Sequence, residues 1–331
     1  MQKILSRELS GQIDTSNNPS MKLNLPSPAS PFNIGTRGSP LALAQAYETR
    51  SRLMAEFDLP EEAFAICVIK VTGDAIQDRP LKEIGGKGLF TREIEEALLD
   101  GSIDIAVHSM KDMPVEQPGG LLLDTYLPRE DVRDAFVSLN ATGLDDLAKG
   151  ATVGTSSLRR RSQLLARRPD LNIVEFRGNV QTRLKKLADG VAEATFLAMA
   201  GLNRLDMKDV PRTAIAPEDM LPAVAQGAIG IERRGDDSRA AAMLDAIHDH
   251  PTGRRLAAER SFLAALDGSC ETPIGGLADL DGNTIRLRGE ILRTDGTEVY
   301  ADDMTGPVED GHMMGQAMAA KLLEQAGPDF F

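Results

Sequence analysis

Three consecutive arginines follow a short hydroxylated segment near the middle of the chain. Residues 154–161 read Gly-Thr-Ser-Ser-Leu-Arg-Arg-Arg, directly after a run of strand character at residues 151–153. A strand that leads through Thr and Ser into a helix presents free backbone N–H groups, hydroxyl donors and the positive end of the helix dipole. The guanidinium fork matches carboxylate and phosphate oxygens, so the segment predicts an anion site. A solvated, charge-rich helix face is the alternative that this run alone leaves open.

The three arginines cannot all face one ligand, because successive helical residues point about 100° apart. We expect Leu158 and Leu165 to mark the buried side of a helix over residues 158–167. Arg159 and Arg160 then fan away from that side toward a ligand. Arg161 points elsewhere and is expected to be structural or solvated.

A second strand-to-helix junction repeats the arrangement. Arg177 ends a predicted strand over residues 172–177, Gly178 turns the chain, and Asn179 can cap a helix over residues 179–188. Arg183 lies one turn into that helix. Arginines at two neighbouring junctions favour a ligand site over a solvated face.

A lysine and an aspartate follow a third predicted strand, residues 103–109. Lys111 and Asp112 stand at its carboxyl end, just before Pro114. Open α/β sheets place their ligands at the carboxyl ends of strands. The alternative for Asp112 is a helix cap or a surface ion pair.

The glycine-rich segment of residues 85–88 lacks the spacing of a phosphate-binding P-loop. It predicts a mobile lid that carries one lysine, Lys87.

Composition narrows the class of ligand. The 331 residues carry a formal charge of −13, which disfavours nucleic acid and anionic membranes, and aromatic residues make up only 4%. No apolar run approaches the roughly 20 residues of a membrane span, and no secretory signal is evident. An acidic chain with local arginine clusters suggests a small anionic ligand in a cleft.

The cysteines and histidines suggest neither a disulfide framework nor a metal site. Cys67 and Cys270 are far apart in the sequence, which fits a reducing compartment. Cys67 lies within a predicted strand over residues 63–71 and is most simply a core residue. The four histidines have no ligand spacing, so we expect no metal.

Strand and helix signals alternate through most of the chain, which predicts an α/β fold with mainly parallel sheets covered by helices. The similar junctions at residues 35–39 and 154–157 suggest two α/β domains that face a shared cleft, and residues after about 251 predict a small α+β domain. The expected parts are a disordered extension over residues 1–31, with Met21 as a hypothetical true start, a first domain of residues 32–127 plus about 228–246, a second of residues 133–222, and a third of residues 250–331.

Several of these segments resemble the porphobilinogen deaminase (hydroxymethylbilane synthase) family. The resemblance runs in order from about residue 34 to the last helix, and it is carried by residues 35–42, 85–90, 108–112, 154–160, 177–179, 200–202, 222–227 and 268–270. It implies two periplasmic-binding-protein-like α/β domains around a cleft, and a third domain that carries a cysteine loop.

The resemblance also implies a transferase that condenses four porphobilinogen molecules head to tail, with loss of ammonia each time. The chain grows on a covalent dipyrromethane primer, and water then releases linear hydroxymethylbilane on the route to haem and related tetrapyrroles. By position, Cys270 would carry the primer through a thioether, and Asp112 would be the catalytic carboxylate.

Further residues follow from the same matching. Those expected to hold the cofactor are Lys87, Lys111, Ser157, Arg159, Arg160 and Arg183, and those expected to hold substrate carboxylates are Arg37, Ser39, Thr155, Arg177 and Arg204. The resemblance also leads us to expect a cytoplasmic monomer with no nucleic-acid or membrane partner. Glu271 departs from the family pattern, and an anion beside Cys270 could weaken contacts with a polyanionic cofactor.

A non-enzymatic anion-binding module of the solute-binding type is the strongest rival. The fold and the arginines alone would permit it. It predicts a secretory signal, however, and it gives Cys270 and Asp112 no role.

Overall fold

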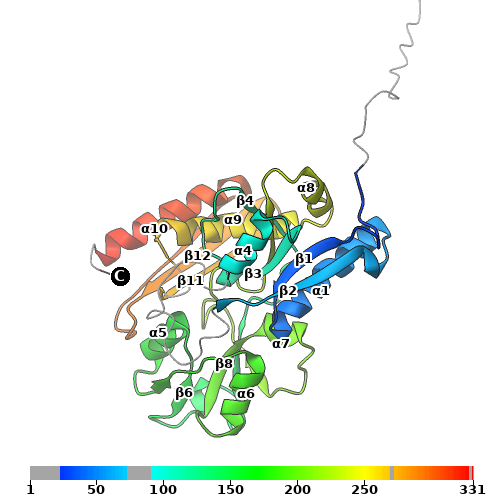
Figure 1. Cartoon of the computed structure of the whole chain (residues 1–331). Helices are drawn as coiled ribbons and strands as arrows, with labels where there is room; N and C mark the ends of the chain where they lie inside the picture. The colour runs from blue at the N-terminus through cyan, green and yellow to red at the C-terminus, as the bar shows by residue number, and fades with distance from the viewer. Residues whose placement is uncertain (1–22, 73–90, 269–271, 328–329, 331) are drawn as a thin grey trace, which may run out of the picture.

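The computed structural model describes residues 23–72, 91–268, 272–327 and 330. These residues form three sheets with helices packed against them (Figure 1). The second sheet and its helices, in green, lie at the bottom of the view, and the last helices lie at the upper left.

The first sheet carries the strand that leads to Lys111 and Asp112. In spatial order its strands are β2 (Phe64–Ile69), β1 (Phe32–Arg37), β3 (Ile105–Ser109), β10 (Ile229–Arg234) and β4 (Leu121–Tyr126). Its helices are α1 (Pro40–Phe57), α4 (Arg92–Leu99) and α8 (Ser238–Asp245). Strand β1 pairs in parallel with β2 and β3, whereas β10 returns antiparallel between β3 and β4.

The second sheet has the same pattern. In spatial order its strands are β7 (Asn172–Val174), β6 (Thr152–Gly154), β8 (Ala194–Ala198), β5 (Asp134–Ser138) and β9 (Arg212–Ala214). Its helices are α5 (Leu158–Arg167), α6 (Val180–Ala188) and α7 (Met199–Arg204). Strand β6 pairs in parallel with β7 and β8, and β5 pairs antiparallel with β8 and β9. The α/β class is confirmed, and each sheet is parallel on one side and antiparallel on the other.

The third sheet is antiparallel and packs against two long helices. Its strands are β11 (Ile274–Asp281), β12 (Thr284–Leu292) and β13 (Val299–Pro307), and its helices are α9 (His250–Ala265) and α10 (Gly311–Ala326). The short 3-10 helices of the chain are η1 (Glu61–Ala63), η2 (Met110–Asp112), η3 (Leu144–Asp146) and η4 (Val308–Asp310). The division into three domains stays a proposal, which these three sheets support.

The predicted disordered extension is too long at its C-terminal end. Leu23 packs against the core of the first sheet, Pro26 is buried, and Ser27 and Ser30 form a β-bridge. An apolar side chain that finds a core surface orders the backbone around it, which a polar local composition does not reveal. Residues 1–22 lie outside the described part of the chain.

The helix starts of the two α/β units follow their local sequence. Ser39 caps α1 by accepting a hydrogen bond from the Ala42 amide at 3.3 Å, and Pro40 occupies the first helical position. Ser157 caps α5 and Asn179 caps α6 in the same way. Each cap stands just beyond a strand, so the helix N-termini lie at the carboxyl ends of the parallel strands.

The predicted core role of Cys67 is only partly met. Its side chain is half-buried in β2 and packs beside Ile94 and Leu98 of α4. Burial raises the pKa of this thiol, and the nearby Asp104 carboxylate adds to the effect. A thiol with a raised pKa is a poor nucleophile at neutral pH.

Candidate active site

Lys111 and Asp112 stand on a tight turn that is anchored on both sides by methionines. They belong to η2, which follows β3 directly, and the Met110 amide donates to Ala228 O at 3.0 Å. Met110 and Met113 are 1% and 5% exposed and pack into the core below α9. Because these neighbours point inward, the turn presents an exposed Asp112 and a half-buried Lys111.

Gly230 of β10 makes room for this anchor. A Cβ atom at that position would collide with the Met110 sulfur. A side chain there would displace Met110, and the turn that carries Lys111 and Asp112 would move with it.

Arg159 and Arg160, the two predicted arginines of α5, are buried and pair with a carboxylate that the sequence analysis did not identify, Asp134. Arg160 donates to Asp134 Oδ1 from Nε at 3.1 Å and from Nη2 at 2.6 Å. Arg159 donates to Asp134 Oδ2 at 2.8 Å. Asp134 is 0% exposed and each arginine 4% exposed, so the three side chains form one buried ion cluster.

The predicted orientation of α5 is therefore wrong. Leu158 and Leu165 are only half-buried, while Arg159, Arg160 and Leu164 face inward. Backbone carbonyls complete the arginine sites: Arg160 donates to Phe196 O at 2.7 Å, and Arg159 donates to Leu221 O at 2.8 Å. Arginine can be buried when its N–H groups find such partners.

Arg161 is exposed, as expected.

Burial alone would raise the pKa of Asp134, but the ion pairs with Arg159 and Arg160 hold it well below its usual value. Asp134 therefore stays ionised throughout the physiological range. It fixes both guanidinium groups at the start of α5.

Arg183 reaches the same region from α6. Its Nε donates to Gly178 O at 2.9 Å. The pKa of Arg183 is lowered to about 10: burial is the main cause, Arg160 and Arg177 add to it, and Asp112 opposes it. The second predicted junction is thus brought next to the first, and Arg183 lies within electrostatic reach of Asp112.

Lys111 completes this group. Burial lowers the pKa of its ammonium to about 8; Asp112 and Asp134 oppose the shift, and Arg160 and Arg183 reinforce it. The lysine and the three arginines of this cationic cluster (Lys111, Arg160, Arg177, Arg183) outnumber its two carboxylates. Like charges held together in a partly dry site favour an anionic ligand.

The other predicted hydroxyls already take part in local structure. Thr155 Oγ1 accepts from the Ser157 amide at 3.2 Å, and Ser157 Oγ accepts from the Arg160 amide at 3.4 Å. Ser39 caps α1, and Arg37 is half-buried at the end of β1.

Arg204 is placed differently from the cationic cluster. Its Nε contacts Glu48 of α1 at 3.3 Å, and its Nη2 donates to Gly227 O at 3.0 Å. It therefore links α7 to the first sheet's helix, two elements that lie side by side in Figure 1.

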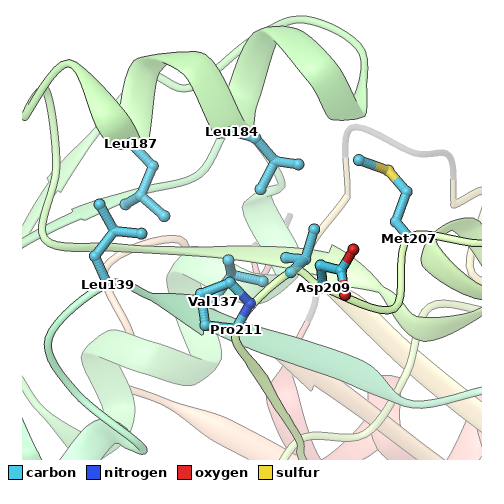
Figure 2. A pocket seen from close by; sticks show the side chains of 8 residues that line it. Val137, Leu139, Leu184, Leu187, Met207, Asp209 and Pro211 are labelled. Carbon is cyan, nitrogen blue, oxygen red and sulfur yellow. The ribbon is translucent and has the colours of Figure 1, made fainter.

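An apolar cavity of about 340 Å³ lies elsewhere on the second α/β unit (Figure 2). Its lining residues are Val137, Leu139, Leu184, Leu187, Met207, Asp209, Val210 and Pro211. Asp209 is the single charged member of that lining, so the cavity does not suit a polycarboxylate.

The described part of the chain offers neither a metal-binding cluster nor a membrane-spanning helix. Within residues 23–72, 91–268, 272–327 and 330, no group of three His, Cys, Asp or Glu side chains could hold a metal ion. Among the same residues, no helix combines the length and the apolar character of a membrane span.

Comparison with known proteins accounts for this combination of turn, arginine helix and third sheet. A family model described as porphobilinogen deaminase, dipyromethane cofactor binding domain, matches residues 32–242, and one for the C-terminal domain of the same family matches residues 254–324. The chain belongs to the porphobilinogen deaminase family.

Individual relatives agree with this assignment. The porphobilinogen deaminase of Paracoccus denitrificans is 66% identical over 93% of this chain and 98% of its own length. The chloroplastic porphobilinogen deaminase of Pisum sativum is 54% identical over 91% of this chain and 83% of its own. A periplasmic binding protein of Salmonella typhimurium with high arginine specificity covers 65% of this chain and 91% of its own, at 15% identity and a TM-score of 0.37, too weak a likeness to support an argument.

Two predicted family positions, Cys270 and Lys87, lie outside the described residues, as does Glu271. Their roles remain predictions. Thr272 and Pro273, directly after them, lead into β11.

Sequence reasoning missed three buried polar residues around the family's motifs. Asp134 opens β5, and Gln45 of α1 exchanges hydrogen bonds with Ser109 at 2.8 and 3.1 Å. Gln226 lies within residues 222–227, which carry the resemblance, but was given no role of its own. An acid or amide in an otherwise apolar strand or helix face was the available signal, since such groups are rarely buried without partners.

Proposed function

We propose that this chain is a hydroxymethylbilane synthase. It condenses four porphobilinogen molecules head to tail, releases one ammonia at each step, and yields linear hydroxymethylbilane for tetrapyrrole synthesis. Family membership supports this activity, and so do the relatives that carry the name porphobilinogen deaminase over most of the chain.

The observation that carries the proposal is the excess of positive charge, on buried and half-buried side chains, around the exposed carboxylate of Asp112. Porphobilinogen brings an acetate and a propionate group, so every added unit brings two negative charges. Lys111, Arg160 and Arg183 have the charge and position to receive such groups, and their mutual repulsion falls when anions bind. A neutral substrate would leave that repulsion unrelieved.

The cofactor of the matched domain fits the same residues. Dipyrromethane carries four carboxylates, and Lys111, Ser157, Arg160 and Arg183 would hold them at the α5 and α6 N-termini. Arg159 would act mainly through Asp134, although its buried Nε has no hydrogen-bond partner among the described residues. When bound, the group supplies a covalently held primer whose terminal pyrrole is extended.

Cys270 is the proposed point of attachment through a thioether. Thiolates are strong nucleophiles, which suits this chemistry, and Cys67 is a poor alternative because its pKa is raised. Lys87 is proposed as a further cofactor contact.

Arg37, Ser39, Thr155, Arg177 and Arg204 are proposed to hold the carboxylates of incoming substrate. The contact of Arg204 with Glu48 means that this residue must exchange partners, or act by joining α7 to α1.

Asp112 is proposed as the catalytic carboxylate. Ammonia leaves from the aminomethyl group of porphobilinogen, and positive charge develops on the pyrrole that remains. An exposed carboxylate at the end of β3 can stabilise that charge and move a proton from the pyrrole nitrogen or carbon. Met110 and Met113 hold it in place while the neighbouring cations bind the substrate's acidic arms.

We also propose a cytoplasmic monomer with porphobilinogen as its small-molecule partner. Sedimentation of the purified chain tests the monomer, and fractionation of the source cells tests the location. A dimeric peak or a periplasmic fraction would each overturn the respective statement.

The function itself is tested by incubating the purified chain with porphobilinogen. We expect consumption of porphobilinogen, one ammonia for each molecule consumed, and one bilane for every four, with turnover abolished in an Asp112→Asn variant. Binding without turnover would instead favour the solute-binding module.

A further inference from the structure

We infer that Gln226 is a positioning residue for the proposed reaction: its side-chain amide joins Lys111 to Asp134 and so sets the reactive turn against the arginines of α5. The inference rests on the proposed function, because it concerns how that site is held together. Gln226 itself touches neither substrate nor cofactor in this account.

The contacts of Gln226 connect the two α/β units. Its Oε1 accepts from the Lys111 ammonium at 3.4 Å, and its Nε2 donates to Asp134 Oδ1 at 3.1 Å and to Val132 O at 2.8 Å. The residue is 1% exposed. Lys111 follows β3 of the first sheet and Asp134 opens β5 of the second, so a single buried amide spans the junction.

The chemistry of these partners requires an amide. An ammonium only donates and an ionised carboxylate only accepts, so one end of the linking group must accept and the other must donate. The partners also fix which way the Gln226 amide is turned. Neither an apolar side chain nor a carboxylate of equal length could satisfy Lys111 and Asp134 together.

The backbone around Gln226 is held in an unusual conformation. Ala225 has φ +61° and Gly227 has φ +88°, and a Cβ at Gly227 would lie 2.5 Å from Glu130 O. Left-handed backbone at a residue other than glycine carries an energetic cost and persists where its surroundings enforce it. That cost indicates that the position of this segment matters.

A buried ion pair supplies the enforcement. Glu259 accepts from the Ala225 amide at 2.7 Å, and Arg129 donates from Nε to Gln226 O at 2.9 Å while it pairs with Glu259 at 2.6 Å. The backbone is thus held at the Ala225 amide by Glu259 of α9 and at the Gln226 carbonyl by Arg129, which precedes β5. The Gln226 side chain is therefore held in one position, between Lys111 and Asp134.

The ammonium that Gln226 holds is sensitive to its surroundings. The charged groups around it are Asp112 on its own turn, Asp134 at the start of β5, Arg160 of α5 and Arg183 of α6. Two of these groups are acidic and two are basic, so their effects on the Lys111 ammonium oppose each other. The neutral Gln226 oxygen, at hydrogen-bond distance, then adds stability to the ammonium form. Its loss makes the ammonium form less stable and lowers the pKa of Lys111.

Two substitutions separate positioning from simple packing. Gln226→Met keeps the length and removes all three side-chain hydrogen bonds, including the one to Lys111, so the pKa of Lys111 should fall by about half to one unit. Gln226→Glu keeps the acceptor and adds negative charge, so that pKa should rise by a similar amount. Gln163→Met is the matched control: it removes another buried amide, one that accepts from Arg159 rather than from Lys111.

The titration is read in two ways on the whole holoenzyme, from about pH 6 to about pH 10. Competitive labelling with acetic anhydride, followed by mass spectrometry of the Lys111 peptide, reports the lysine without turnover. The alkaline limb of kcat/KM for porphobilinogen reports its use in the reaction, and turnover of Gln226→Met should fall about tenfold or more.

Opposite shifts in the Met and Glu variants, with the Gln163→Met titration unmoved, are the expected result. The inference would be overturned if the pKa of Lys111 stayed the same in both variants, or moved in the same direction in both. It would also be overturned if that pKa moved without any change in turnover. Circular dichroism identifies the folded variants. If one variant fails to fold, the direction in which the pKa of Lys111 moves in the other decides the inference. A wild-type chain that does not consume porphobilinogen overturns the proposed function, and the labelling arm still tests the Gln226 contact.

Discussion

Arg160 donates two hydrogen bonds to the same carboxylate oxygen, Asp134 Oδ1: one from Nε at 3.1 Å and one from Nη2 at 2.6 Å. The second oxygen of Asp134 is taken by Arg159, so one buried aspartate orients two arginines at the N-terminus of α5. A cationic site built this way is rigid before any ligand arrives. Preorganised charge of this kind binds anions without further ordering of the side chains.

Asp134→Asn should therefore destabilise the protein strongly. Two buried guanidinium groups would lose their counter-charge, and breaking a buried ion pair costs about 3–5 kcal/mol. The folded-state pKa of Asp134 is depressed, so its contribution is present above the unfolded pKa of about 3.9 and is lost as pH falls toward the folded value. Urea unfolding near pH 7 and near pH 2 should show a gap between wild type and variant that narrows in acid, because the lower pH lies inside the window where the contribution is lost.

The control is Asp303→Asn, which removes the carboxylate of a surface pair with Arg286. Exposed pairs contribute little, so we expect a much smaller change. Equal losses from the two substitutions would contradict the anchoring role of Asp134.

Asp112→Asn should abolish turnover and leave the fold intact. The side chain is exposed at the end of β3, and its methionine neighbours rather than its carboxylate hold the turn. Loss of an acid–base group costs about 10²–10⁴ in rate. Steady-state kinetics and thermal unfolding check the two halves of this prediction, with Glu116→Gln, an exposed acid four residues on, as control. An Asp112→Asn variant that is slow because it is unfolded would contradict a catalytic role for Asp112.

Activity should decline above about pH 8, where Lys111 loses its charge. Burial lowers the pKa of this lysine to about 8, and only its ammonium form attracts carboxylates. Lys111→Arg should move the alkaline limb of kcat/KM to higher pH, because a guanidinium stays charged. Lys185→Arg, on the exposed face of α6, should leave the limb in place. An unchanged limb in Lys111→Arg would assign it to another group.

Glu290→Gln should stabilise the protein at neutral pH. Glu290 lies on β12 and accepts a hydrogen bond from Gln163 of α5, which an amide oxygen can also accept. Burial raises the pKa of Glu290, so its ionised form costs stability once the pH exceeds the unfolded pKa. We expect a gain of a few degrees in Tm near pH 7 that disappears below about pH 4, where the carboxyl is protonated in both states. A loss of stability at neutral pH would mean that the charge is needed beside Arg159.

Local signals in the sequence were enough for the elements that present the site. The helical pattern after the hydroxylated segment predicted α5 with its observed limits, residues 158–167. The strand before Lys111 was predicted to end at residue 109, which is where β3 ends. Caps and alternating apolar residues act within a few positions, so they can be read without the fold.

The burial of Arg159 and Arg160 could not be predicted in the same way. Arginine is ordinarily a surface residue, and Asp134, which makes burial possible, lies 25 and 26 positions away from them. The predicted inward face of α5 was consequently wrong. Tertiary partners decided the orientation.

Strand β11 was missed for a different reason. It opens with Ile274 followed by Gly275 and Gly276, and glycine weakens a strand signal. In the fold these glycines allow close approach: a Cβ at Gly275 would lie 2.7 Å from the Glu290 carboxylate, and one at Gly276 would lie 2.8 Å from Val224. The sequence pattern does not contain those neighbours.

The central claim is that this chain builds its product on a dipyrromethane primer attached to Cys270. Intact mass spectrometry of the purified protein tests it most directly, with Cys67→Ser as the control for the other thiol. We expect the wild type and Cys67→Ser to carry an excess mass equal to one dipyrromethane, and Cys270→Ser to carry none and to be inactive. A wild type that turns over porphobilinogen at its unmodified mass, or an excess that persists in Cys270→Ser, would contradict the claim.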